Sequence, residues 1–158
     1  MTKKVIRYLS LALFIAATVF IFSNSTQTGD VSGGQSRPFV MFIKGIIGKL
    51  LGVEANDEAV TFFVRKTAHI IEFFMQSAFL CVFLILSARR FLGIYTLFSG
   101  LFTACMDEYI QTFSDGRAGM ISDVFVDFYG VLIAFVCYAI VFIWLKKKKP
   151  DFFEGSIF

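Results

Sequence analysis

Ionisable and amide side chains recur within three strongly apolar stretches of the chain, where such groups are costly and usually face a partner or a cavity. In the stretch RKTAHIIEFFMQS, His69 and Glu72 are three residues apart and Glu72 and Gln76 are four apart. This spacing places the three side chains on one face of a helix. The other two stretches, CMDEYIQ and SDVFVDFYG, contribute further polar residues: Asp107, Glu108, Gln111, Asp123 and Asp127.

These residue types suit the binding of a polar headgroup and acid–base chemistry on that headgroup. His69 and Glu72 form the predicted acid–base pair, and Asp107 and Glu108 are the further candidates for catalytic carboxylates. Arginine forks and lysine ammonium groups bind phosphate oxygens. The candidate ligand-binding residues are Arg65, Lys66, Gln76, Gln111, Arg117, Asp123 and Asp127.

The predicted site holds more carboxylates than cations. They cannot all stay ionised in a low-dielectric pocket unless cations, hydrogen bonds or a metal compensate them. Mg²⁺, Ca²⁺ or Mn²⁺ bound by the acids is one open solution, whereas zinc is not favoured because His69 is the only histidine and HExxH is absent. The other solution is structural, an ion-pair network in which Arg117, Asp107 and Asp123 tie helix ends together.

Composition and hydropathy predict a membrane protein around these residues. Of the 158 residues, 57% are hydrophobic and 17% are charged, whereas about a quarter of a soluble domain is charged. A bilayer core needs roughly 20 helical residues, and four stretches qualify: 5–22, 68–88, 91–111 and 122–145. We expect one all-α integral membrane domain over residues 1–158. The first stretch is expected to be an uncleaved anchor rather than a signal peptide, because no good A-x-A site follows it.

Lysine and arginine predict the orientation of the four transmembrane helices. Nine of the fifteen basic residues lie in three short segments beside apolar stretches: Lys3, Lys4, Arg7, Arg89, Arg90 and Lys146 to Lys149. Four spans bring these segments to one side, which the positive-inside rule assigns to the cytoplasm. We expect a multi-pass protein of the cell membrane with both termini cytoplasmic. The net charge of +3 does not predict binding of nucleic acid, because the basic residues lie beside the apolar stretches and set the topology.

The outer loop, residues 23–67, divides into two parts. Its first part, SNSTQTGDVSGGQSRP, is rich in Gly, Ser and Thr and is predicted to be a flexible or turn-rich connector. Residues 39–52 show apolar side chains at helical spacing, which predicts an amphipathic helix in the outer interface or, alternatively, a packing helix that caps the bundle. Asn56 or Asp57 is expected to cap a helix that continues directly into the second span.

The polar motifs resemble a known family. RKTAHIIEFF, followed after about 35 residues by DEYIQTFSDGRAGMISDVFVDFYG, is similar to the motif pattern of the VanZ-like membrane proteins. The segment FSNSTQTGDVSGGQS also resembles the part of that family that follows the first helix. The motif residues carried over are Arg65, Lys66, His69, Glu72, Asp107, Glu108, Gln111, Arg117, Asp123, Asp127 and Gly130. Many members have histidine at the position of Ile110, so chemistry that requires this second histidine is in doubt.

The resemblance implies a four-helix integral membrane protein, often bacterial, whose namesake is linked to low-level resistance to the glycopeptide teicoplanin. We expect an outer-facing pocket that binds or modifies the headgroup of an envelope lipid or a lipid-linked cell-wall component. The alternative is a non-enzymatic accessory protein that acts by binding a lipid or a partner. A proton or ion pathway is disfavoured because the inner halves of the spans contain no ionisable residue.

Overall fold

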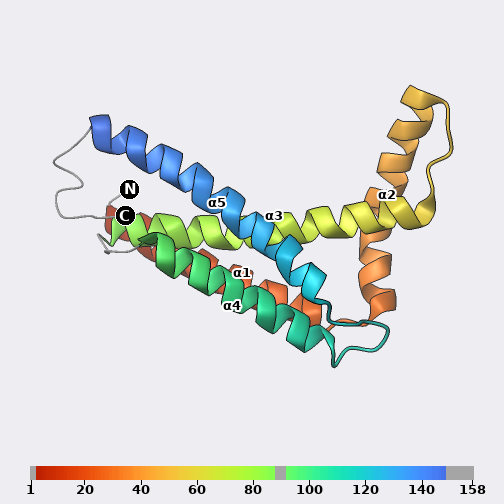
Figure 1. The fold of residues 1–158 in the computed structure, drawn as a ribbon, viewed down its shortest axis with the longest axis horizontal. Helices are drawn as coiled ribbons and strands as arrows, with labels where there is room; N and C mark the ends of the chain where they lie inside the picture. Colours follow the sequence, from red (N-terminus) through yellow and green to blue (C-terminus); the bar gives the residue numbers. More distant parts are fainter. Residues whose placement is uncertain (1–2, 88–91, 149–158) are drawn as a thin grey trace.

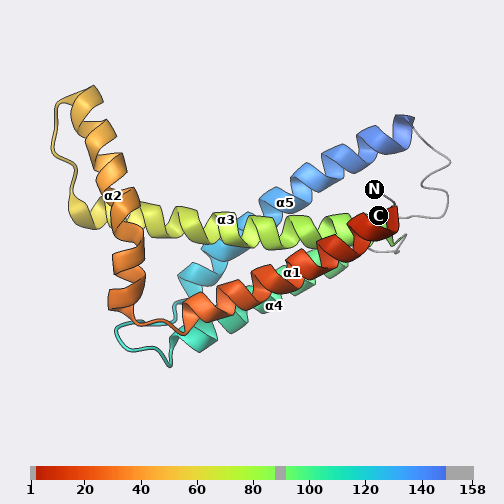
Figure 2. The same ribbon diagram turned by 180° about the vertical axis from the view of Figure 1, so that it is seen from behind.

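The computed structural model describes residues 3–87 and 92–148, and within these ranges it contains helices and turns but no strand. The helices are α1 (Lys3–Ser25), α2 (Gly29–Leu51), α3 (Asp57–Leu86), α4 (Leu92–Gln111) and α5 (Ile121–Lys148). Figures 1 and 2 show that α1, α3, α4 and α5 run lengthwise, while α2 stands across one end. The predicted all-α fold is therefore confirmed.

Three helices are long and apolar enough to cross a membrane by length and composition: α1, α3 and the part Ile121–Leu145 of α5. The helix α4 is not among them, although it covers the third predicted span. The beginnings of α1 and α4 and the ends of α3 and α5 lie at one end of the molecule (Figure 1). Arg89 and Arg90 lie outside the described residues.

The prediction of a flexible connector before residue 39 is wrong, because α2 already begins at Gly29. The hydroxyl oxygen of Thr28 accepts a hydrogen bond from the amide of Val31 and caps the helix. The amide of Gly29 donates to the carbonyl oxygen of Asp115 at 2.9 Å, so a distant turn also fixes the helix start. Gly and Ser have low helix propensity, and here the cap and this tertiary contact override it.

The helix α2 has one side that packs and a wide side that does not. Val40 is buried against Val60 and Val64 of α3, as expected of a packing helix. Several large apolar side chains of α2 are nevertheless exposed: Phe39, Met41, Phe42, Leu50 and Leu51. The contact of Val40 agrees with the predicted packing helix, while a position in the membrane interface stays a prediction.

The helix α3 is the central element, and it packs against each of the other four helices. Its first amides are satisfied by Asn56, whose side-chain oxygen accepts from the amide of Ala59 at 3.1 Å. The helix then continues without interruption from Asp57 to Leu86. The predicted cap and the predicted continuation into the second span are confirmed.

A direct backbone contact joins α3 to α5 at Gly130. A Cβ atom added to Gly130 would lie 2.3 Å from the carbonyl oxygen of Ile70 and 2.9 Å from the amide nitrogen of Phe74. Neither neighbour is a flexible side chain that could turn away, so only glycine allows this separation of the helices. The cluster of Phe73, Ala104 and Val131 fills the space between the helices close to this contact.

We predict that Gly130→Ala destabilises the protein, because α5 must move away from α3 to admit a methyl group. Overpacking of this kind costs about 1–3 kcal/mol. The matched control is Gly34→Ala, at a helical position of α2 where nothing lies within 4 Å of the added Cβ. The control should be neutral or stabilising by up to about 1 kcal/mol. The measurement is the thermal unfolding midpoint in detergent micelles, and equal midpoints for Gly130→Ala and wild type would contradict the backbone contact.

Candidate functional site

Three helices bring a histidine and two aspartates together at the end of the molecule where α2 lies. His69 of α3 is 3.0 Å from an oxygen of Asp127 on α5 and 3.9 Å from an oxygen of Asp107 on α4, both measured from Nδ1. Asp107 is 1% exposed and Asp127 is 0% exposed. A carboxylate bonded to one ring nitrogen orients the imidazole and favours proton transfer or ligand binding at the other.

Asp107 receives hydrogen bonds from α1 and from its own helix, α4. The hydroxyl of Ser25, at the end of α1, donates to one carboxylate oxygen, and the side-chain amide of Gln111 donates to the other at 2.8 Å. Gln111 also donates to Glu108 at 3.0 Å. Because hydrogen bonds to a carboxylate stabilise its charge, this arrangement offsets part of the cost of burying Asp107.

The turn between α4 and α5 is hydrogen-bonded to the end of α1 and to the first turn of α2. Arg117 donates to the carbonyl oxygen of Asn24 at 3.2 Å and to the hydroxyl of Ser32 at 2.7 Å. The side chain of Asn24 in turn donates to Glu72 at 3.3 Å. Asn24, Ser25 and Ser32 are absent from the predicted site residues. In the sequence, they are indicated only by the similarity of the segment after the first helix to the corresponding segment of the VanZ-like proteins.

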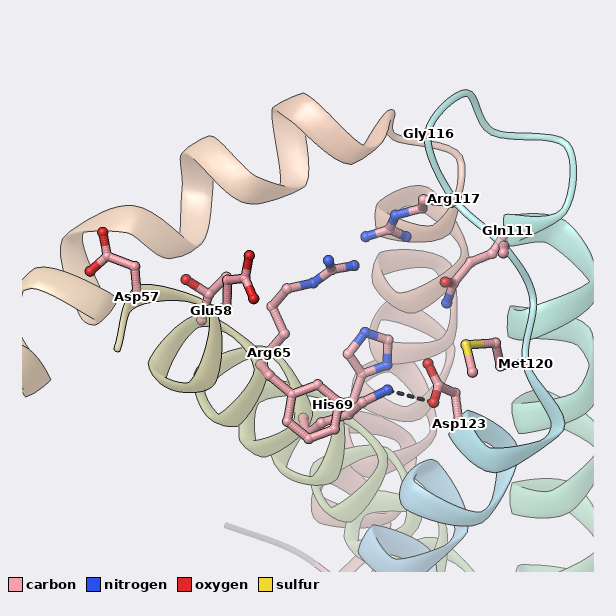
Figure 3. Close-up of a pocket in the computed structure, with 13 residues that line it drawn as sticks. Asp57, Glu58, Arg65, His69, Gln111, Gly116, Arg117, Met120 and Asp123 are labelled. Carbon is pink, nitrogen blue, oxygen red and sulfur yellow. Dashed lines mark ion pairs between the residues drawn. The ribbon is translucent and has the colours of Figure 1, made fainter. Parts of the chain in front are cut away.

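Two cavities meet at this site. The first, of about 530 Å³, opens between the start of α3 and the turn before α5 (Figure 3), and its lining includes Arg65, Lys66, His69, Gln111, Arg117 and Asp123. The second, of about 460 Å³, lies between α1, α2 and α3, and its polar lining includes Asn24, Ser25, Glu72 and Asp107. Arg65, His69 and Arg117 line both cavities and so form their shared wall.

Two guanidinium groups lie close together in this shared wall. Figure 3 shows the side chains of Arg65 and Arg117 pointing towards one another above His69. Within the described ranges neither arginine forms an ion pair, and the Nε of Arg117 is buried without a hydrogen-bond partner. Burial lowers the pKa of Arg117 and the nearby charge of Arg65 lowers it further, against the opposite effect of the carboxylates of Asp107, Glu108 and Glu72. The two guanidinium groups make this wall electropositive, and the Nε–H of Arg117 has no acceptor.

The remaining predicted residues occupy other positions. Lys66 forms an ion pair with Asp123 at 2.5 Å. Glu108 accepts from the amide of Met120 at 2.9 Å, which fixes the start of α5. Gln76 lies deeper in the bundle and donates to the hydroxyls of Thr18 and Thr103 at 2.9 and 3.1 Å. The predicted residues that are not among the lining of either cavity are Gln76, Glu108 and Asp127.

The pairings differ from those that sequence spacing suggested. His69 is hydrogen-bonded to Asp127 of another helix, whereas its helical neighbour Glu72 receives the amide of Asn24. The suggested ion-pair network of Arg117, Asp107 and Asp123 is replaced by other contacts. Asp123 pairs with Lys66, and Arg117 donates to neutral oxygens.

A comparison with protein families identifies the relationship that the motifs suggested. A family model described as VanZ/LLP1 matches residues 9–143, a range that includes every residue of the two cavities. No curated protein and no solved structure matches the chain significantly. Since the match extends over most of the sequence, the chain belongs to the VanZ/LLP1 family.

Proposed function

We propose that this protein binds the phosphate-bearing headgroup of an envelope lipid or a lipid-linked cell-wall component. The observation that carries the proposal is the pair of guanidinium groups, Arg65 and Arg117, in the wall shared by two cavities without a carboxylate partner. Two like charges at close range disfavour each other. An anion held between them offsets that repulsion and accepts hydrogen bonds from the guanidinium groups.

Phosphate suits this wall better than a carboxylate ligand of similar charge. It offers several oxygens in different directions, and arginine forks bind such oxygens through paired hydrogen bonds. Lys66 lies in the same cavity and its ammonium group is already held by Asp123. We propose that Lys66 only adds positive electrostatic potential to the cavity, whereas the two arginines contact the phosphate directly.

The lining of the second cavity favours a lipid ligand over free phosphate. Beside its polar end it is lined by apolar side chains from three helices: Phe20, Ile21, Phe39, Ile43, Phe63, Val64 and Ile71. A molecule with a charged head and an apolar chain matches both surfaces, because the chain gains by leaving water while the head stays hydrogen-bonded. The arginines stand at the junction where head and chain would join.

The proposed membrane topology has four spans with both termini in the cytoplasm, by the distribution of lysine and arginine. The cavities then lie at the outer leaflet, and α2, with its exposed apolar side chains, lies in the outer interface. A lipid or lipid-linked precursor held there would be less accessible to an externally applied glycopeptide. Resistance to teicoplanin is therefore the phenotype that we propose for this protein.

We predict that Arg117→Ala abolishes protection of a sensitive Gram-positive strain against teicoplanin, because it removes one of the two phosphate-binding groups. The matched control is Arg37→Ala, which removes an exposed arginine of α2 that is not part of the lining of either cavity. The measurement is the minimal inhibitory concentration of teicoplanin, with membrane levels of all variants matched by immunoblot. Full protection by a well-inserted Arg117→Ala variant would refute the role of the arginine pair.

We also predict that a large side chain in the second cavity displaces the lipid chain. Ala68 lines the second cavity, and Ala68→Trp should fill the space that the chain would occupy. We expect native mass spectrometry of the protein released from detergent to show bound lipid in wild type and little in Ala68→Trp. The control is Ala12→Trp, at an exposed position of α1 outside the lining of both cavities. Equal lipid occupancy in both tryptophan variants would argue against a chain in this cavity.

A further inference from the structure

A histidine and two aspartates from three helices form a compact group beside the cavities. We infer that His69, Asp107 and Asp127 bind one divalent transition-metal cation. The proposed function requires only that the arginines bind an anion, so the cation site stands independently of lipid binding. The sequence alone did not favour zinc, because His69 is the only histidine and HExxH is absent, and it left Mg²⁺, Ca²⁺ or Mn²⁺ bound by the acids open.

The geometry of the group is that of a chelating set. One potential ligand atom from each side chain lies within 4.8 Å of the other two. Nδ1 of His69 is 3.0 Å from an oxygen of Asp127 and 3.9 Å from an oxygen of Asp107. Two ligands with bonds of about 2.1 Å to one ion lie roughly 3 to 4 Å apart. A cation bound by all three ligands would lie to one side of the line between Nδ1 of His69 and the Asp127 oxygen, and it would replace the hydrogen bond between them.

An unpartnered oxygen in the group provides an observation independent of this spacing. Oδ2 of Asp127 is buried and has no hydrogen-bond partner, and the residue as a whole is 0% exposed. A buried carboxylate oxygen without a donor loses its hydration and gains nothing in return. A bound cation would supply the missing partner through a direct bond or a coordinated water.

The charges around the group also favour a cation. Among the residues that the structure describes, no lysine or arginine forms an ion pair with Asp107 or Asp127. Lys66 pairs instead with Asp123, and Arg117 donates to the neutral oxygens of Asn24 and Ser32. A single imidazole offsets at most one negative charge. A divalent cation balances both carboxylates while leaving the histidine neutral, as a metal ligand must be.

Neighbouring side chains hold the ligands in place. Ser25 and Gln111 donate to the two oxygens of Asp107, and such hydrogen bonds orient metal-binding carboxylates in proteins. His69 lines both cavities, so the site is accessible to an ion and to a further oxygen ligand. A mixed set of one imidazole and two carboxylates suits zinc or a similar transition metal better than Mg²⁺ or Ca²⁺, which prefer oxygen alone.

The test measures metal binding by the full chain with any purification tag removed. The protein in detergent micelles is stripped with a chelator, equilibrated with Zn²⁺ alone and separated from free ion, and bound zinc is counted by inductively coupled plasma mass spectrometry. We expect about one ion per chain in wild type and at least about tenfold weaker binding by Asp127→Asn. The control Asp115→Asn removes an exposed carboxylate of the turn before α5 and should bind zinc as wild type does.

Two results would overturn the inference: a wild-type protein that retains no zinc, or an Asp127→Asn variant that folds and retains as much as wild type. Should the variant not fold, the X-ray absorption spectrum of the zinc-loaded wild type decides the matter. Scattering from one imidazole ring, which can only be that of His69, supports the site. A spectrum without imidazole, or one dominated by sulfur at about 2.3 Å, assigns the zinc to other groups and refutes the site.

Discussion

The backbones of α3 and α5 touch at Gly130, and the positions of the polar side chains depend on this contact. Asp127 lies one helical turn before Gly130, and His69 directly precedes Ile70, whose carbonyl oxygen faces the glycine. Close approach of the two backbones is what allows these side chains to meet at 3.0 Å. A larger residue at Gly130 would therefore disturb the polar site as well as the packing of the bundle.

Burial of two aspartates is a cost that the end of the bundle near α2 must offset. Asp107 receives donors from α1 and from its own helix, through Ser25 and Gln111. Asp127 has His69 on one oxygen and no partner on the other. Buried carboxylates with incomplete compensation are uncommon in a purely structural network and are typical of sites that bind or react. The incomplete hydrogen bonding of Asp127 therefore points to a binding or reactive site at this position.

The turn before α5 and the start of α2 hold the electropositive wall in place. A Cβ on Gly29 would lie 2.7 Å from the carbonyl oxygen of Gly116, and Gly116 itself has a φ of 71°, which favours glycine. These two glycines let the loops meet, and Arg117 follows directly in the chain. Its hydrogen bonds to Asn24 and Ser32 then place its guanidinium group opposite that of Arg65.

The sequence by itself determined the helical stretches and which polar residues share a helix face, because both follow from the local periods of the chain. It also identified the family through its motifs. Tertiary structure alone decided that His69 pairs with Asp127 rather than with Glu72, because the partner belongs to a helix nearly 60 residues away. It likewise decided that residues from Gly29 onward are helical, since the turn at Asp115 stabilises a segment whose own propensity is low.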